Sequence, residues 1–467
     1  MAAHPVSHFL ISPLSDGAAG LPLSRNKIPS SPKPKVTRQQ PFPKISARLD
    51  SRPLRAAVIG GGPAGASAAE ALAVGGVETY LIERSPSGSK PCGGAIPLCM
   101  LEEFSIPADL IDRRVTQMRI FSPSNITADF GRSLRPGEHI PMLRREVLDS
   151  FLRRRAESRG AHLIAGVFTS LEPPSPSSFV TEPYLVRYAA GGSPRTLAAD
   201  IVIGADGANS RVAKSIDAGP YAQAIAFQER IRLPPSQMDR YADLAEMYVG
   251  SDVSPDFYGW VFPKCDHVAV GTGTTLAWGD IKKYQAGIRA RVGKKIAGGE
   301  VIKVEAHPIP EHPRPRRVRG RVALVGDAAG YVTKCSGEGI YFAAKSGRMC
   351  GEAIVRVWRG NGGGMVTEGD LRREYLRRWD EEYSGMYRFL DLLQRVFYGS
   401  NEGREAMVEL CGDDYVQRMT FESYFYKKMA AGDPWKGLGL LGKTIGSLVK
   451  AQIVGSWRES EMNQMMY

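Results

Sequence analysis

The alternation of apolar and polar stretches predicts that an α/β domain begins near residue 54. A short apolar run at 54–59 is followed by a glycine-rich turn, and residues 66–74 have the alanine-rich composition of a helix that stops at Gly75-Gly76. A second apolar run follows at 78–82. Two strands joined through a helix pair in parallel, so this segment is predicted to be the βαβ start of a parallel sheet.

The pattern predicts further elements along the chain. Residues 143–159 place several large apolar side chains on one face, which predicts an amphipathic helix. Apolar runs at 199–203 and 321–325 predict buried strands, each ending in a glycine-containing turn. We expect short strands within 116–140 and 183–190, antiparallel strands within 222–275, and mainly helices over 337–398.

The first 50 residues differ from the remainder in composition. They contain seven Ser, eight Pro and two acids, and residues 1–49 carry +6 of the net charge of +12. Such a segment cannot bury a core, and its composition is typical of an organelle transit peptide. The prolines disfavour the amphipathic helix of a mitochondrial leader, so a plastid address is predicted. A basic tail without an address is the alternative interpretation.

Composition narrows the function classes. The 467 residues are 43% hydrophobic, which excludes a disordered chain, and the length indicates two or three domains. Half of the net charge lies in the leader and no zinc-finger or RNA-binding pattern occurs, so no nucleic-acid partner is expected. The six cysteines form no CxxC pair, so no metal site and no disulfide framework is expected. The sequence has no run of 18 apolar residues and predicts no transmembrane helix.

The glycine-rich turn has the spacing of a dinucleotide-binding motif. Gly60 permits the sharp turn, Gly62 lets a pyrophosphate approach the backbone, and Gly65 lets the helix pack closely on the sheet. The helix N-terminus then faces the phosphates with its N–H groups. Glu83 ends the second strand, where an acid can bind a ribose. Ala64 in the turn and Arg84 after Glu83 complete this predicted cofactor site.

Two later turns favour FAD over a nicotinamide as the resident cofactor. Gly326-Asp327 and Asp206-Gly207 each follow a predicted strand, which places an acid at the carboxyl edge of the sheet. With the first motif they resemble glutathione-reductase-type flavoproteins of the aromatic-hydroxylase kind. The resemblance implies that Asp327 binds the ribityl chain, that the Asp206 turn serves FAD and transient NADPH, and that Arg145 contacts FAD. An ordinary turn carboxylate for Asp206 and a solvated helix face for Arg145 are the alternatives.

An aromatic strand is the next candidate for function. Alternation places Tyr258, Trp260 and Phe262, which precedes Pro263, on one face of a strand. Such a face can wall an apolar cavity, although core packing is the commoner explanation.

The Tyr-x-Trp-x-Phe-Pro pattern resembles the signature of the geranylgeranyl reductase family. The segment Cys92-Gly93-Gly94 also matches that family, and the turn Gly337-x-Gly339-Ile340 resembles its loop beneath the flavin. These likenesses cover about residues 54–395. They imply that FAD is reduced by NADPH and that three double bonds of a geranylgeranyl chain become saturated. The chain is carried on diphosphate or chlorophyll, and the products serve chlorophyll, tocopherol and phylloquinone synthesis.

The chemistry implied by this resemblance needs a proton donor and a dry site. Tyr258 and Trp260 can stabilise positive charge on the alkene through their faces, and a dry cavity protects that charge from water. Cys92 and Tyr258 are the two candidate donors. An inert buried thiol is the alternative for Cys92. The clusters at 153–155 and 314–321 are rich in arginine and can bind phosphate, although a solvated surface is expected for both.

The resulting prediction is an α/β fold: a glutathione-reductase-type Rossmann FAD-binding domain, an inserted mixed or antiparallel sheet domain for substrate, and a helical C-terminal region. The FAD domain is expected at 51–115, 140–222 and 314–360, the isoprenoid domain at 116–139 and 223–313, and the C-terminal region at 361–467.

Residues 437–457 of that region form a basic amphipathic segment suited to a membrane surface, with docking on the protein's own core as an equal alternative. Resemblance to plant members of the family implies peripheral attachment to the stroma-facing thylakoid membrane and a light-harvesting-like partner. A monooxygenase on the same scaffold and a non-catalytic flavin-bound scaffold are the competing functions.

Overall fold

The computed structural model describes residues 53–88, 90–175 and 182–427. All of them belong to one compact unit. The predicted transit peptide and the segment 437–457 lie outside the described residues.

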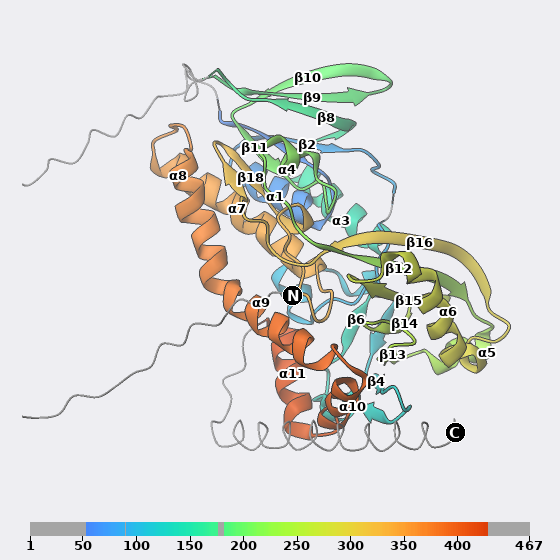
Figure 1. Cartoon of the computed structure of the whole chain (residues 1–467). Helices are drawn as coiled ribbons and strands as arrows, with labels where there is room; N and C mark the ends of the chain where they lie inside the picture. Colours follow the sequence, from blue (N-terminus) through green and yellow to red (C-terminus); the bar gives the residue numbers. More distant parts are fainter. Residues whose placement is uncertain (1–52, 89, 176–181, 428–467) are drawn as a thin grey trace, which may run out of the picture. The chain divides into compact units, whose positions relative to one another are not determined.

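A six-stranded sheet forms the first layer, in the order β17-β18-β11-β1-β2-β7 (Figure 1). Its strands are β1 (Arg55–Ile59), β2 (Glu78–Glu83), β7 (His162–Ala165), β11 (Ile201–Gly204), β17 (Val318–Arg319) and β18 (Val322–Leu324). All neighbours pair in parallel except β17 with β18. The parallel sheet predicted from the βαβ start is confirmed.

Helices cover this sheet because its central strands β1, β11 and β18 are apolar and buried on both faces. They are α1 (Pro63–Val74), α3 (Arg145–Ser158) and α7 (Ile340–Gly360), with the shorter α2 (Cys99–Glu103) and α4 (Arg211–Ser215) nearby. α1 begins at Pro63, in the first helical position that proline favours. α1 and α7 cross closely: a Cβ at Gly347 would lie 1.9 Å from the Ala64 carbonyl oxygen. A three-stranded antiparallel sheet, with β8 (Val167–Glu172), β9 (Tyr184–Ala190) and β10 (Ser193–Ala199), packs on the same core.

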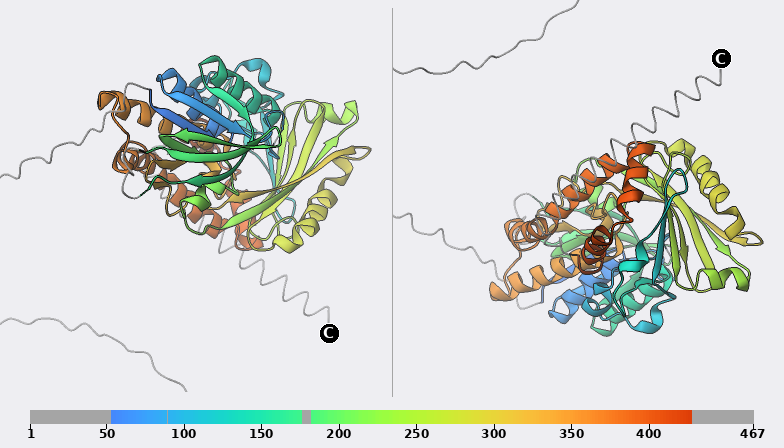
Figure 2. Two further views of the ribbon diagram at one scale, coloured as in Figure 1. Left: turned by 90° about the horizontal axis from the view of Figure 1, so that it is seen from above. Right: turned by 90° about the horizontal axis from the view of Figure 1, so that it is seen from below.

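The second layer is a seven-stranded sheet in the order β16-β12-β15-β14-β13-β4-β5, beside the first sheet in Figure 2. Its strands are β4 (Gln117–Phe121), β5 (Thr127–Asp129), β12 (Gln223–Arg232), β13 (Leu244–Tyr248), β14 (Gly259–Pro263), β15 (His267–Thr274) and β16 (Glu300–Pro310). It is antiparallel except for the β4–β13 pair. The mixed sheet in the fold prediction is therefore confirmed. β3 (Arg113–Val115) and β6 (Ile140–Met142) form a separate pair.

Helix α6 (Ile281–Val292) packs on one face of the second sheet through Ile288 and Val292. A short helix, α5 (Pro235–Arg240), lies within the stretch predicted as strands only. The consecutive prolines at 234 and 235 explain this difference, because proline suits a helix start and cannot donate to a strand ladder.

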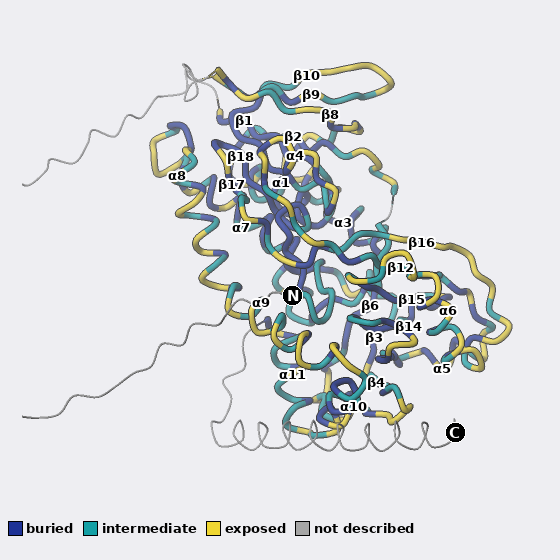
Figure 3. Tube along the Cα trace, in the orientation of Figure 1, coloured by how far each residue is buried: buried dark blue, intermediate teal, exposed yellow. Residues whose placement is uncertain are grey.

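The C-terminal part is helical, as predicted. It contains α8 (Glu368–Leu371), a π-helical turn (Arg372–Leu376), α9 (Arg377–Phe397), α10 (Asn401–Leu410) and α11 (Asp414–Tyr426). The first half of α9 packs Trp379 and Tyr383 against Phe342 of α7. Figure 3 shows buried residues concentrated in the first sheet and α1, and exposed ones along α9. Among the described residues, no helix has the length and apolar content to cross a membrane.

Candidate active site

A cavity of about 1390 Å³ lies against both sheets and the C-terminal helices. One part is lined by the glycine turns and acids at the carboxyl ends of the parallel strands. The other part is lined by apolar side chains of the second sheet, α9, α10 and α11. A polar region therefore continues without a break into an apolar one.

The structure brings most of the predicted site residues together around this cavity. The lining includes Gly60, Gly62, Ala64, Glu83, Arg84, Cys92, Gly93, Gly94, Arg145, Asp206, Gly207, Tyr258, Trp260, Phe262, Asp327, Gly337, Gly339 and Ile340. The cavity lining does not include Gly65, Gly326 or Pro263. A Cβ at Gly65 would lie 1.7 Å from the Gly60 carbonyl oxygen, and one at Gly326 would lie 2.8 Å from the Ala64 Cβ. These two glycines permit close packing behind the cavity wall.

The turn at the start of α1 leaves its backbone open toward the cavity. Gly60 has a φ of +101°, which favours glycine. The nearest atom to a Cβ at Gly62 would be Arg145 Nη2, 3.8 Å away, so space is left above this backbone. Glu83 Oε2 accepts a hydrogen bond of 2.5 Å from the Gly61 N–H. Glu83 therefore fixes the turn and remains on the cavity wall.

Asp327 projects into the polar part of the cavity and forms an ion pair with Lys90. Burial alone would raise the pKa of Asp327, but Lys90, with His307 and Arg145, outweighs burial and holds that pKa below its usual value. Burial, together with Lys90, lowers the pKa of His307 to about 3. Its buried Nε2 has no hydrogen-bond partner among the described residues. Polar atoms that a ligand can engage thus remain in this region.

The alternative for Arg145, a solvated helix face, is wrong. Its side chain is 7% exposed, and its guanidinium binds both carboxylate oxygens of Asp149, at 2.8 and 2.7 Å. This pair uses two of the three guanidinium nitrogens, and both Arg145 and Asp149 line the cavity. Asp206 accepts hydrogen bonds from the Ser210 hydroxyl at 2.5 Å and from the Arg211 N–H at 2.7 Å, so it caps α4 while it lines the cavity. Burial raises its pKa.

The solvated surface expected for the two arginine clusters is wrong in part, because several side chains reach main-chain carbonyls. Arg153 is 4% exposed and donates to the carbonyl oxygens of Gly61, at 3.0 Å, and Pro86, at 2.6 Å. Arg314 is also buried and donates to the Ala328 carbonyl at 2.9 Å. These arginines brace the backbone around the first sheet.

The aromatic strand belongs to the hydrophobic core and also lines the cavity. Core packing and a cavity wall, the two interpretations of this strand, therefore both apply. The ring centroids of Tyr258 and Trp260 lie 5.9 Å apart, and those of Trp260 and Phe262 lie 6.4 Å apart. The Tyr258 hydroxyl donates a 2.7 Å hydrogen bond to the Ser336 carbonyl. Burial raises the pKa of Tyr258 far above its usual value.

The Cys-Gly-Gly segment and the aromatic strand are in direct contact. A Cβ at Gly93 would lie 2.8 Å from the Phe262 ring, so the strand needs glycine there. Gly94 has a φ of +75°, and its N–H donates to Cys92 Sγ at 3.3 Å. Two motifs that are about 165 residues apart therefore form one wall of the cavity.

The sequence analysis missed the contribution of the C-terminal helices. The cavity is also lined by Met386, Phe389, Leu390, Leu393 and Phe397 of α9, Met407 and Leu410 of α10, and Val416 and Met419 of α11. The spacing of 386, 390, 393 and 397 on one helix face is a sequence signal that predicts an apolar contact. It does not say which part of the chain lies opposite.

Two ion pairs hold α11 in place beside the cavity. Arg418 binds both carboxylate oxygens of Glu138, at 2.6 and 3.0 Å, and this contact lowers the pKa of Glu138 to about 2. Lys427, at the end of α11, pairs with Glu338 in the turn next to Asp327. The helical wall is thereby joined to the polar end of the cavity.

Comparison with known proteins places this site in a family. No family model matches the chain. It is 61% identical over 431 residues to the chloroplastic geranylgeranyl diphosphate reductase of Arabidopsis thaliana, covering 91% of this chain and 92% of that protein. The chain belongs to the geranylgeranyl diphosphate reductase family. The geranylgeranyl diphosphate reductase of Synechocystis is 59% identical over 404 residues, which cover 85% of this chain and 98% of that protein. The resemblance to geranylgeranyl reductases stated from the motifs is confirmed.

Solved structures show the same fold at low sequence identity. A geranylgeranyl bacteriochlorophyll reductase-like protein from Thermoplasma acidophilum superposes with a TM-score of 0.68 at 20% identity, covering 81% of this chain and 98% of that one. An aromatic hydroxylase from angucycline biosynthesis superposes with a TM-score of 0.56 at 22% identity, covering 82% and 77%. The predicted aromatic-hydroxylase-like fold of this reductase family member is confirmed.

Proposed function

We propose that this chain is an NADPH-dependent FAD enzyme that saturates three isolated double bonds of a geranylgeranyl chain, giving phytyl. The substrate is geranylgeranyl diphosphate or geranylgeranyl-chlorophyll, and the product serves chlorophyll, tocopherol and phylloquinone synthesis. Family membership supports this proposal. The structural observation that carries it is a single cavity whose polar part is lined by the glycine-rich turn at Gly60 and whose other part is apolar.

The residues present fit FAD. The open backbone at Gly62 and the N-terminus of α1 suit a pyrophosphate, and Glu83 suits a ribose. Asp327 is available to the ribityl chain once Lys90 leaves it, and the turn from Ser336 to Ile340 lies beside the same space. When bound and reduced, the flavin supplies hydride for the alkene. NADPH is proposed as the reductant that visits this site.

The chain's own residues provide a dry environment and a proton. Tyr258 and Trp260 present aromatic groups that stabilise positive charge developing on the alkene. The apolar residues of α9 and α11 exclude water. Since the Tyr258 proton is engaged by the Ser336 carbonyl, we infer that Cys92 donates the proton to the second alkene carbon. Cys92 lines the cavity and directly precedes Gly93, which lies against the Phe262 ring of the aromatic strand.

Two conservative variants test this assignment of the donor. We expect Cys92→Ser to lower kcat by roughly 100-fold or more, in the range typical of a lost general acid. Tyr258→Phe keeps the ring and is expected to lower kcat by less than about tenfold, mainly through the loss of one hydrogen bond. Single-turnover rates measured with pre-reduced enzyme separate these effects from NADPH oxidation. A larger loss of kcat in Tyr258→Phe than in Cys92→Ser would instead identify Tyr258 as the proton donor.

Mass analysis of products from purified protein, NADPH, FAD and geranylgeranyl diphosphate tests the reaction itself. We expect three successive gains of two hydrogens, and we expect them without oxygen. A gain of oxygen that requires air would instead establish the monooxygenase alternative. Flavin binding without any product would establish the scaffold alternative.

We propose a plastid location for this chain, at the stroma-facing thylakoid surface and beside a light-harvesting-like protein. The names of the plant relatives support the plastid. The basic amphipathic composition of 437–457 supports surface attachment. Deletion of 437–467 is expected to abolish co-flotation with vesicles of thylakoid lipid composition. Unchanged flotation of the deleted protein would contradict the role of this segment.

A further inference from the structure

Lys264 directly follows the aromatic strand, and the proposed chemistry gives it no task. Its side chain is buried, with 3% of the residue exposed, and it does not line the cavity. Among the described residues it takes part in no ion pair, although Asp112 and Glu146 lie close enough to influence it. Burying an ammonium without a carboxylate partner costs free energy. The hydrogen bond that the Lys264 ammonium does make therefore indicates what the side chain does.

That hydrogen bond leads directly to Cys92. Lys264 Nζ donates to the carbonyl oxygen of Gly93. The N–H of the same peptide group belongs to Gly94, and it donates to Cys92 Sγ at 3.3 Å. A cation on the carbonyl polarises the peptide and makes its N–H a stronger donor. The ammonium is thus connected to the sulfur through a single peptide unit.

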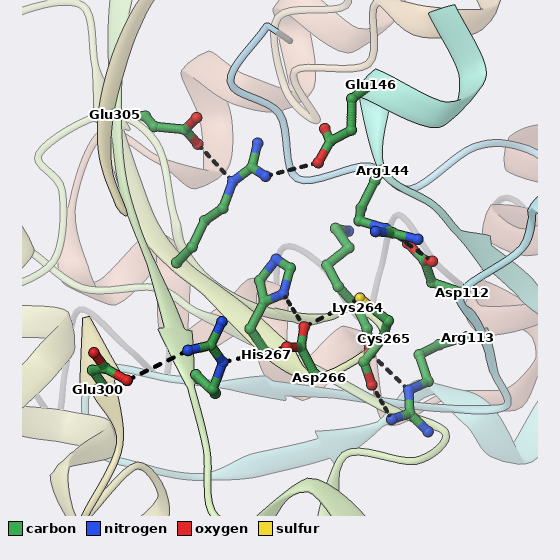
Figure 4. Close-up of polar contacts among 12 residues, drawn as sticks. Asp112, Arg113, Arg144, Glu146, Lys264, Cys265, Asp266, His267, Glu300 and Glu305 are labelled. Carbon is green, nitrogen blue, oxygen red and sulfur yellow. Dashed lines mark hydrogen bonds and ion pairs between the residues drawn. The ribbon is translucent and has the colours of Figure 1, made fainter. Parts of the chain in front are cut away.

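The surrounding backbone fixes this arrangement. Arg113 donates from Nε to the Lys264 carbonyl at 2.8 Å and from Nη2 to the Cys265 carbonyl at 2.5 Å. The Lys264 N–H donates to the His267 carbonyl at 2.8 Å. Figure 4 shows Lys264 amid these charged side chains, with Arg144 and Arg113 nearby. A Cβ at Gly94 would lie 2.6 Å from Nζ, so the lysine fits against glycine.

We propose that Lys264 is a positioning residue, whose ammonium orients the Gly93–Gly94 peptide so that this peptide holds Cys92 Sγ at the cavity wall and stabilises negative charge on it. The effect on Cys92 follows from these contacts alone, whereas the effect on turnover rests on the proposed function. If Cys92 gives its proton to the alkene, the electron pair of the S–H bond stays on sulfur, where the Gly94 N–H meets it. After the product leaves and solvent enters, a proton from solvent restores the thiol before the next cycle.

Burial lowers the pKa of Lys264 to about 8. The ammonium is therefore present below that pH and lost above it, so positioning of Cys92 weakens as the pH rises through 8. The groups facing Lys264 from neighbouring elements are Asp112, Arg113, Arg144, Glu146, Arg230 and His267, and those around Cys92 are Arg145, Tyr258 and Tyr424. Burial lowers the pKa of His267, so it is neutral across this range.

Alkylation of Cys92 by iodoacetamide at pH 7 tests the proposal without substrate or flavin, with the modified peptide identified by mass. We expect Lys264→Met to slow alkylation roughly tenfold, because the sulfur loses a polarised donor. Lys264→Arg keeps a cation and is expected to stay within about twofold of the wild type. Lys282→Met removes an exposed lysine on α6 and is the control for charge loss. A wild-type rate in Lys264→Met, or an equal loss in Lys264→Arg, would overturn the proposal.

The pH profile of kcat gives a second readout, which does not depend on the folding of Lys264→Met. We expect the wild-type kcat to fall above about pH 8, the value to which burial lowers the Lys264 pKa. Lys264→Arg should remove this fall, since arginine stays charged. A fall that persists unchanged in Lys264→Arg would overturn the proposal. Absence of turnover in the wild type, with Cys92 alkylation still dependent on Lys264, would count against the proposed function alone.

Discussion

Gly65→Ala is expected to yield protein that contains almost no FAD and unfolds at a lower temperature. The new Cβ would lie 1.7 Å from the Gly60 carbonyl oxygen and 3.1 Å from the Ala205 side chain. Because the clash at 1.7 Å is with a backbone atom, which cannot rotate away as a side chain can, α1 must move away from the sheet, at a cost of about 2–3 kcal/mol. That movement also displaces the helix N-terminus from the proposed pyrophosphate site. Thermal unfolding and the flavin absorbance of the purified protein measure the two effects.

Gly62→Ala is the matched control, since it adds the same methyl group three residues earlier. Its φ is −71°, which alanine adopts, and the nearest atom would be Arg145 Nη2 at 3.8 Å. We expect the apoprotein to keep its unfolding temperature while FAD binding weakens about tenfold or more, equivalent to about 1.4 kcal/mol. Equal destabilisation by the two variants would contradict this division between a packing glycine and a cofactor glycine.

Met419→Trp is expected to lower kcat/KM for a twenty-carbon prenyl diphosphate on the order of 100-fold. Met419 lies on α11 and lines the apolar part of the cavity, so an indole there removes space that a long chain needs. A ten-carbon prenyl diphosphate needs less of the cavity, and its kcat/KM should change by less than about threefold. Steady-state kinetics with the two chain lengths give the comparison.

Met419→Leu preserves volume and serves as the control, with an expected change of about twofold or less for both substrates. The Met419→Trp protein should retain its FAD, because Met419 and the glycine turns belong to different parts of the cavity wall. Full activity of Met419→Trp on the long substrate would place the prenyl chain elsewhere.

The polar half of the site could be predicted because its signals are local. Within six residues, Gly60 permits a sharp turn, Gly62 leaves its backbone open to a ligand and Gly65 lets the helix pack on the sheet. Such requirements are visible in the spacing of the glycines alone. Asp327 likewise lies in the turn just after its strand, which ends at Leu324. The parallel sheet could be predicted for the same reason, from apolar runs separated by turns.

The remaining features depend on contacts between distant segments. The composition of Arg153 and its neighbours indicates a solvated run, and no pattern shows that the Gly61 and Pro86 carbonyls lie within its reach. The apolar face of α9 and the side chain of Met419 predict burial but not the partner, so their place on the cavity wall needed the fold. Lys264 directly follows the Tyr-x-Trp-x-Phe-Pro pattern in the sequence, but its connection to Cys92 runs through a main-chain peptide and could not be predicted.

The contact between Gly93 and Phe262 has a consequence for how this site can change. A methyl group at position 93 meets the ring at 2.8 Å, so each of the two positions limits the size of the other. A larger residue at position 93 therefore needs a smaller one at position 262. If the two substitutions arise one after the other, the first of them gives a less stable protein. Redesign toward bulkier or branched prenyl substrates is therefore better begun with paired substitutions than with single ones.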